Sequence, residues 1–319
     1  MPQSTDLTIT SLKTSLLRVP WATEPPANGI MPPTHREFLV LEIATRGGIT
    51  GMGYLQPLSG GLETLDMCLK EMVGPKIIGR DATEIEAIWQ TLWKSTYWLG
   101  RGGIATFALS AVDIALWDVF GKHCGQPLHQ MLGGRCFDRL RVYNTCAGYR
   151  YVRAGDYRAV ANWTPAADSG PYEDLDAFTH RADALAESLL EQGITAMKIW
   201  PFDVAARETG GRYITSAQLK AALEPFEKIR RAFGDRMDIM VEFHSLWDLP
   251  TALQIARELE PYKPFWYEDP IVMNSPQALA EYARATRVRV CASETWGSRW
   301  PYKEFLDRDA LHVAMTDLS

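Results

Sequence analysis

The chain has 319 residues, of which 46% are hydrophobic, and it carries a formal net charge of −6 with a pI near 5.6. A chain of this length and composition can bury a large core, and it suits two domains or one α/β barrel with an extension. Its 33 Lys and Arg residues are scattered along the sequence, so no basic field for phosphates is expected and nucleic acid is excluded as a partner.

The beginning of the chain, MPQSTDLTIT, has no basic region followed by an apolar run, and no later segment approaches 18 uninterrupted apolar residues. The sequence therefore indicates neither export nor a membrane span, and we expect a cytoplasmic protein without a membrane partner. The five cysteines are widely spaced and form no CxxC pair, which is typical of reduced, buried thiols and not of a disulfide or zinc framework.

Residues 7 to 56 contain three segments in which apolar and polar side chains alternate. The Pro-rich stretch PWATEPPANGIMPP and the pair Gly47 and Gly48 separate them, which predicts an antiparallel meander. From Leu62 to about Gly125 the apolar period becomes helical, and ATFALSAVDIALWDVFGKHCG has small or apolar residues on nearly every face, as a deeply buried helix does. We therefore predict an α+β domain over residues 1–135.

After residue 135 short apolar runs alternate with amphipathic helices such as SAQLKAALEPFEKIRRAF. The runs are LRVYNTC, AMKIW, DIMVEFH, PFWYED, VRVCASE and LHVAMTD. This alternation predicts an α/β fold with a parallel sheet covered by helices, most simply a (β/α)8-type barrel over residues 136–319. No Rossmann or P-loop glycine fingerprint follows any run, which disfavours a nucleotide-binding sheet.

Four of these strands end in an acid, namely Glu242, Glu268, Glu294 and Asp317, at spacings of 26, 26 and 23 residues. One βα unit takes about that many residues, so the carboxylates should converge on the mouth of the barrel. Carboxylates at such short distances repel one another unless a cation lies between them. A ligand set made only of oxygen atoms favours Mg²⁺ over Zn²⁺. The alternative is that each acid caps the helix after its strand, which the equal spacing disfavours.

Two further residues belong to the same predicted mouth. Lys198 ends the strand before Glu242, where it could hold a substrate carboxylate or accept a proton, although lysines at strand ends are commonly only solvated. His244 follows Glu242 by two residues and should face the same side of the strand, which makes it a candidate acid or base as well as a candidate structural histidine. Two irregular segments, 150–175 and 201–215, interrupt the barrel pattern at positions where loops set specificity.

These residues resemble the enolase superfamily, specifically its mandelate racemase and muconate lactonizing enzyme branch, over essentially the whole chain. Residues 1–135 resemble its capping domain, and ALSAVDIALWDVFGKHCGQPLHQMLGG resembles the helix and strand entry that join cap to barrel. The series Glu242, Glu268 and Glu294 matches its metal-ligand spacing. The resemblance implies an Mg²⁺-dependent enzyme that removes the α-proton of a carboxylate substrate and passes through an enediolate held by the metal.

The chain departs from the racemases at the motif Lys-x-Lys, because Trp200 stands where the second Lys serves as a base. Two-base racemisation is therefore not expected, while Lys198 matches the first Lys and could contact the substrate carboxylate. Glu242-Phe243-His244 resembles the acid-x-His motif of sugar-acid dehydratases, whose His protonates the departing β-hydroxyl.

Asp317 matches an Asp that orients the usual His base of those dehydratases, which lies on the next strand. The chain ends at Ser319, so we expect a barrel truncated after about its sixth strand, without that base. Residues 19–33 and 56–61 resemble the family's substrate-covering loops and supply Trp21 and Gln56 as candidate substrate contacts, with Trp200 as a third.

The sequence therefore favours a dehydratase that converts a sugar acid to a 2-keto-3-deoxy sugar acid. A cycloisomerase, an epimerase or a racemase on the same scaffold is the alternative. A catalytically inactive scaffold or fragment is the alternative from another class. The family's habit of assembling favours a homo-oligomer, which nothing in the sequence tests.

Overall fold

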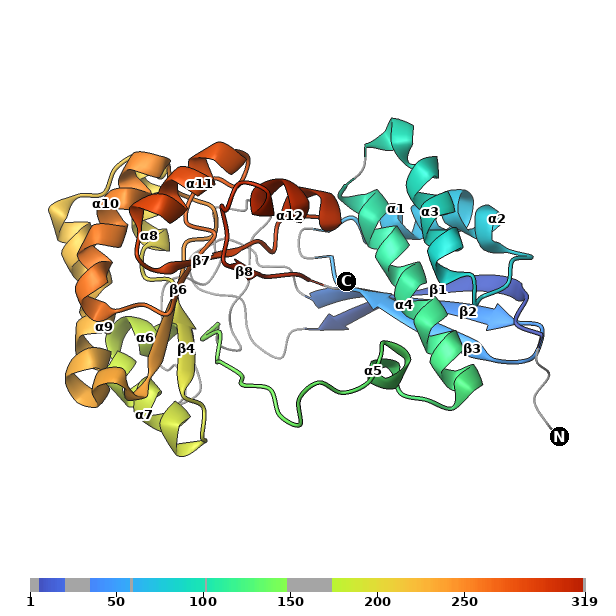
Figure 1. Cartoon of the computed structure of the whole chain (residues 1–319), viewed down its shortest axis with the longest axis horizontal. Helices are drawn as coiled ribbons and strands as arrows, with labels where there is room; N and C mark the ends of the chain where they lie inside the picture. The colour runs from blue at the N-terminus through green and yellow to red at the C-terminus, as the bar shows by residue number, and fades with distance from the viewer. Residues whose placement is uncertain (1–5, 21–34, 58–59, 101, 148–173, 318–319) are drawn as a thin grey trace. The chain divides into compact units, whose positions relative to one another are not determined.

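The computed structural model describes residues 6–20, 35–57, 60–100, 102–147 and 174–317 (Figure 1). The described residues divide into two compact units, one ending at Leu140 and the other running from Arg141 to Asp317. The division falls a few residues beyond the boundary expected after residue 135. Each unit is described by itself.

The N-terminal unit contains a three-stranded antiparallel sheet in the order β1-β2-β3. Its strands are β1 (Ile9–Pro20), β2 (His35–Thr45) and β3 (Thr50–Leu55). Side chains alternate along β2, so that Leu39, Leu41 and Ile43 are fully buried on one face. The predicted meander is confirmed.

Helices cover the buried face of this sheet. The helices of this unit are α1 (Leu62–Met67), the π-helical turn η1 (Cys68–Val73), α2 (Gly74–Ile77), α3 (Ile85–Ser95), the short 3-10 helix η2 (Tyr97–Leu99), α4 (Ile104–Cys124) and α5 (Leu128–Met131), and α1, η1, α2 and α4 contact the sheet. By length and composition α4 could cross a membrane, a property that core helices of globular domains share.

The packing of α4 explains its apolar sequence. Its alanines Ala108, Ala111 and Ala115 are fully buried, and β3 presents glycines to them. A Cβ atom on Gly53 would lie 2.1 Å from the carbonyl oxygen of Ala111, so only glycine admits the helix at this distance. The helix ends at Cys124, and its C-cap residue Gly125 has a left-handed φ of 63°, which glycine adopts without strain.

The C-terminal unit is built on a five-stranded parallel sheet in the order β4-β5-β6-β7-β8. The strands are β4 (Ala196–Ile199), β5 (Asp238–Glu242), β6 (Trp266–Glu268), β7 (Arg289–Ala292) and β8 (Val313–Ala314). Five of the six predicted strands are therefore confirmed. The first, LRVYNTC, contributes an isolated parallel bridge between Asn144 and Met197.

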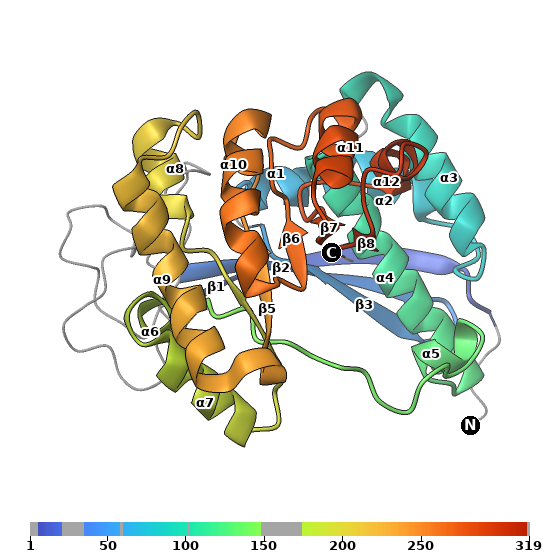
Figure 2. The same ribbon diagram turned by 60° about the vertical axis from the view of Figure 1, so that its left-hand side comes forward.

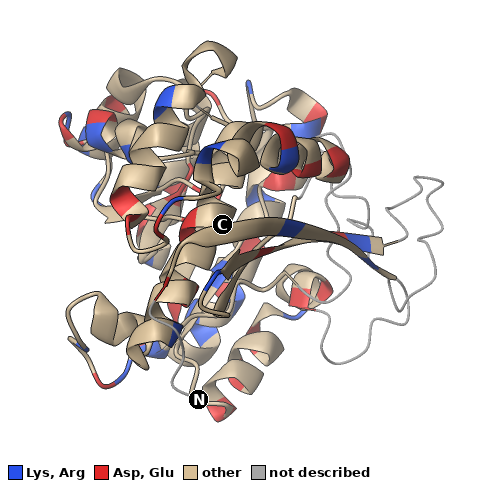
Figure 3. Ribbon diagram, turned by 90° about the vertical axis from the view of Figure 1, so that its right-hand side faces the viewer, with Lys and Arg blue, Asp and Glu red and all other residues tan. Residues whose placement is uncertain are grey.

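Helices connect these strands, as the alternating pattern predicted (Figure 2). They are α6 (Asp174–His180), α7 (Ala182–Glu191), α8 (Asp203–Thr209), α9 (Ser216–Phe233), η3 (Gly234–Arg236), α10 (Leu249–Leu259), η4 (Glu260–Tyr262), α11 (Pro276–Ala285) and α12 (Arg299–Leu306). Basic and acidic residues are interspersed along them (Figure 3).

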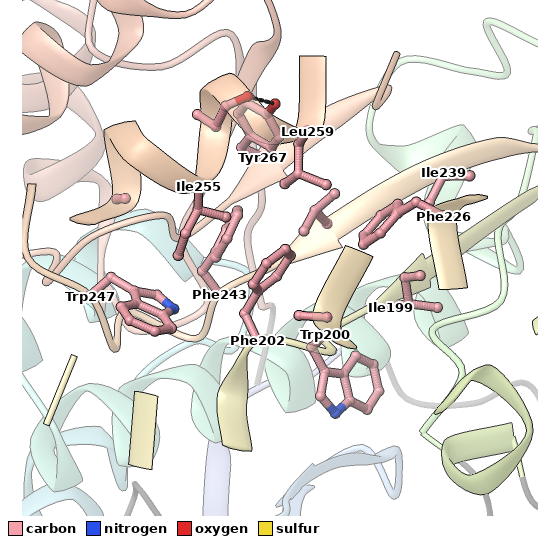
Figure 4. Packing of buried hydrophobic residues seen from close by; sticks show 14 of the residues in the cluster. Ile199, Trp200, Phe202, Phe226, Ile239, Phe243, Trp247, Ile255, Leu259 and Tyr267 are labelled. Carbon is pink, nitrogen blue, oxygen red and sulfur yellow. Dashed lines mark hydrogen bonds between the residues drawn. The ribbon is translucent and has the colours of Figure 1, made fainter. Parts of the chain in front are cut away.

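An aromatic and aliphatic core fills the space between β4, β5, β6 and these helices (Figure 4). The rings of Phe202 and Phe243 stack with centroids 5.5 Å apart, and the Tyr267 hydroxyl donates to the carbonyl oxygen of Ala256 at 3.1 Å. Such close packing fixes the strand ends, where the predicted site residues lie.

Candidate active site

Strand periodicity places three predicted site residues on one face of the sheet. Met197, Ile199, Ile239, Val241 and Tyr267 belong to the core between the sheet and its helices. The residues that alternate with them, Lys198, Glu242 and Glu268, therefore face the opposite side. Glu242 and Glu268 are register partners on the adjacent strands β5 and β6.

Lys198 joins the two carboxylates. Its Nζ lies 2.9 Å from Oε2 of Glu242 and also donates a hydrogen bond to Oε1 of Glu268. The side chains of Lys198, Glu242 and Glu268 are 8%, 2% and 0% exposed, so water screens the ion pairs very little. The Tyr143 ring centroid lies 5.9 Å from the same ammonium group.

The remaining oxygens of the two carboxylates are also held. Oε1 of Glu242 accepts backbone N–H bonds from Phe243 at 3.1 Å and from His244 at 2.9 Å. Oε2 of Glu268 accepts from the indole Nε1 of Trp266 at 3.0 Å. Both carboxylates are therefore fixed in orientation before any ligand arrives.

The two carboxylates differ in protonation because they share one ammonium group. Burial by itself raises the pKa of Glu242, but the charges of His244 and Lys198 outweigh it and hold the pKa below its ordinary value. Burial and the neighbouring Glu242 carboxylate raise the pKa of Glu268 to about 10. Burial lowers the pKa of Lys198, yet the two acids outweigh this and raise it. At neutral pH the cluster therefore holds an ammonium group, one ionised carboxylate and one protonated carboxyl group.

His244 is held beside this cluster by a residue that sequence reasoning missed. Nδ1 of His244 lies 2.6 Å from Oδ2 of Asp203, the first residue of α8, and both side chains are largely buried. The Trp200 ring meets the imidazole edge-on with centroids 5.5 Å apart. The sequence placed Asp203 inside an irregular segment, and no spacing rule connects it to a histidine 41 residues later.

Asp269 is a second residue that sequence reasoning left without a role. It has a positive φ of 42° and is 1% exposed. Its Oδ2 accepts from the Ser293 hydroxyl at 2.7 Å, while Oδ1 is buried without a hydrogen-bond partner among the described residues. Burial, followed by the charge of Glu242, raises its pKa to about 8. The motif FWYEDP was the available signal, but strict alternation would direct this residue away from Glu268.

The other predicted site residues lie apart from the Lys198 cluster or are not described. Glu294 follows β7, is exposed, and lies near enough to Asp269 for its charge to raise the pKa of that carboxyl group. Asp317 is exposed beyond the end of β8. Gln56 is half-buried in the N-terminal unit, and Trp21 lies outside the described residues.

Helix capping, the alternative role for the strand-end acids, does not account for them. The N-cap residues of α10, α11 and α12 are Asp248, Ser275 and Ser298. Glu242, Glu268 and Glu294 therefore do not cap the helices that follow their strands. These acids therefore need a role other than helix capping.

The donor set fits a hard divalent cation in its chemistry. Glu242 and Glu268 are buried carboxyl groups on adjacent strands. Asp269, whose Oδ1 is buried without a hydrogen-bond partner among the described residues, lies near enough to Glu242 and Glu294 for their charges to raise its pKa. Within the described ranges no group of three or more His, Cys, Asp or Glu side chains is already arranged around one point as metal ligands. In this arrangement Lys198 supplies the positive charge between Glu242 and Glu268.

Comparison with known proteins identifies both units. Residues 11–133 match the family model of the mandelate racemase / muconate lactonizing enzyme N-terminal domain, and residues 181–319 match the enolase C-terminal domain-like model. A D-mannonate dehydratase of Xanthomonas oryzae is 29% identical over 285 residues, which are 89% of this chain and 65% of the relative. A D-galactonate dehydratase of Xanthomonas euvesicatoria is 30% identical over 287 residues, which are 88% of this chain and 64% of the relative. The chain thus spans slightly less than two thirds of the length of these two relatives.

Solved structures of the same family are similar to this chain. An enolase of the mandelate racemase subgroup from Agrobacterium tumefaciens is 41% identical, with a TM-score of 0.76 over 98% of this chain and 71% of that one. A racemase from Streptomyces coelicolor with bound magnesium is 25% identical, with a TM-score of 0.73 over 95% of this chain and 74% of that one. The chain belongs to the mandelate racemase and muconate lactonizing enzyme family of the enolase superfamily.

Proposed function

We propose that this chain takes part in the Mg²⁺-dependent dehydration of a sugar acid to a 2-keto-3-deoxy sugar acid. The observation that supports this most directly is the buried cluster of Lys198, Glu242 and Glu268, with His244 held beside it. The dehydratases among the relatives support the reaction class and the substrate class.

The residues divide the work by their chemistry. Glu242, Glu268 and Glu294 would hold Mg²⁺, which when bound supplies positive charge where the substrate carboxylate gains electron density. The α-proton would pass to a base, for which the resemblance implies a histidine on the strand after Asp317. Lys198 would bind and orient the substrate carboxylate. His244 would donate a proton to the β-hydroxyl group as its C–O bond breaks, so that water leaves instead of hydroxide. Trp200, buried against His244, would exclude bulk water from the ring.

The test is a screen of the full-length protein against aldonic and aldaric acids, with Mg²⁺ and with EDTA, in which semicarbazide detects 2-keto acids. We expect keto-acid formation that requires Mg²⁺ and is lost in His244→Ala and Glu268→Gln. Glu281→Gln, which changes an exposed glutamate on α11, is the matched control and should retain activity.

Calorimetry of Mg²⁺ binding accompanies the screen. A folded protein that binds Mg²⁺ but forms no keto acid from any of these substrates contradicts the proposal. If NMR then shows deuterium exchange at the α-carbon of a substrate that loses no water, the protein is assigned to the epimerases or cycloisomerases.

A further inference from the structure

The imidazole of His244 is fixed from more than one side. Its Nδ1 lies 2.6 Å from Oδ2 of Asp203, and the Trp200 ring meets it edge-on at an interplanar angle of 71°. Its own backbone N–H donates to Oε1 of Glu242 at 2.9 Å. The ring therefore has a defined position relative to the carboxylate cluster.

Aromatic packing fixes the position of Asp203 relative to His244. Phe202 precedes Asp203 and Phe243 precedes His244, and the two phenylalanine rings stack with an interplanar angle of 26° (Figure 4). Both rings are fully buried in the core of the C-terminal unit. The stack ties the start of α8 to the end of β5, so the contact between Asp203 and His244 does not depend on a flexible surface side chain.

The hydrogen bond restricts where the ring carries its proton. With Asp203 ionised, its carboxylate can only accept a hydrogen bond, and the donor at this distance is the Nδ1–H group of His244. Nε2 is then the basic nitrogen of the neutral ring. A carboxylate that selects one tautomer and one orientation of a histidine is a general device of acid and base sites.

We propose that Asp203 is the positioning residue of His244, holding the hydrogen on Nδ1 and directing Nε2 to the substrate. Asp203 itself acts through the imidazole and touches no reacting atom. The functional consequence rests on the proposed role of His244 in dehydration, whereas the tautomer is a property of this chain alone.

The tautomer can be read directly by NMR. Long-range ¹H–¹⁵N correlation spectra of the ¹⁵N-histidine-labelled chain contain six histidines, and the His244→Asn variant identifies the signals of interest. At a pH where the ring is neutral, we expect the Nδ1–H pattern in the unsubstituted chain. A dominant Nε2–H pattern there overturns the proposal without any further variant.

Variants test the cause. Asp203→Leu removes the acceptor at similar volume and should shift His244 to the Nε2–H tautomer, whereas Asp203→Glu should restore the Nδ1–H pattern. The matched control is Asp174→Leu, which removes a different acid, one that accepts from Asn144 at 2.8 Å, and should leave the His244 pattern unchanged. An unchanged pattern in Asp203→Leu overturns the proposal.

Kinetics separate this inference from the proposed function. In an active chain, Asp203→Leu should lower kcat by on the order of 10²-fold or more with little change in KM, because the wrong tautomer impairs proton transfer and not binding. Keto-acid formation together with an Nε2–H His244 overturns the positioning role and leaves the dehydratase function standing. The expected tautomer in a chain without keto-acid formation supports the positioning and contradicts the proposed function.

Discussion

Replacing Lys198 with Met tests the electrostatic description of the site. Met is close to Lys in shape but carries no charge, so the substitution removes only the ammonium group between Glu242 and Glu268. Both carboxyl groups remain buried, at 2% and 0% side-chain exposure. The variant therefore leaves an uncompensated charge inside the C-terminal unit.

The expected cost follows from the protonation of the cluster. Removing one partner of a buried ion pair costs about 3–5 kcal/mol. Although Lys198 contacts two acids, Glu268 with its pKa of about 10 already holds a proton at neutral pH, so one unpaired charge is counted and not two. Since 1 kcal/mol shifts the melting temperature of a unit of roughly 150–250 residues by about 2–4 °C, the loss should be about 6–20 °C.

Thermal unfolding followed by circular dichroism in EDTA at pH 7 measures this loss. The control is Lys263→Met, because Lys263 and its partner Asp235 are 72% and 73% exposed and their ion pair should contribute less than about 1 kcal/mol. Equal melting temperatures for the two variants would refute the assignment of the buried positive charge to Lys198.

The same variant has a predicted pH dependence. Without the ammonium group the folded-state pKa of Glu242 should rise above its unfolded value, so the native state would bind more protons than the unfolded state above about pH 4. Stability of the variant should then increase as pH falls from 7 toward 5, by up to about 1.4 kcal/mol per unit, and its deficit should narrow. A deficit that is constant between pH 5 and 7 contradicts this reasoning.

Three further substitutions test other parts of the structure. Because the Asp269 pKa is raised to about 8, its native carboxyl group keeps a proton that the unfolded chain loses above about pH 4, so this group makes the unsubstituted chain less stable as pH rises from 5 to 8. Asp269→Asn lacks this loss and should become more stable relative to the unsubstituted chain as pH rises from 5 to 8. A difference in the free energy of urea unfolding that stays constant over this range would contradict the prediction. Gly53→Ala should destabilise the N-terminal unit by about 1–3 kcal/mol, measured by urea unfolding, because the new Cβ would clash with the Ala111 carbonyl oxygen. An unchanged urea midpoint would show that α4 can move away from β3 at no cost in stability. Tyr267→Phe removes one buried hydrogen bond to Ala256 and should cost about 1 kcal/mol in the same assay; no loss would indicate that the bond contributes nothing net.

The sequence by itself determined the architecture and one face of the site. Apolar alternation predicted the meander of the N-terminal unit, and small residues predicted the buried helix α4 that packs against β3. In the C-terminal unit the two-residue period of a strand required Lys198, Glu242 and Glu268 to face away from the core. These features are local and periodic, so they can be read without knowing which segments meet.

Only the tertiary structure decided how the site is completed. Asp269 joins it because the chain turns through a positive φ directly after β6, where strand periodicity no longer applies. Asp203 reaches His244 because the stack of Phe202 on Phe243 joins α8 to β5. Equal spacing grouped Glu294 with the other acids, yet it lies exposed after β7, apart from the Lys198 cluster. Such contacts depend on the backbone beyond the strand ends and on packing between distant segments, which sequence spacing does not encode.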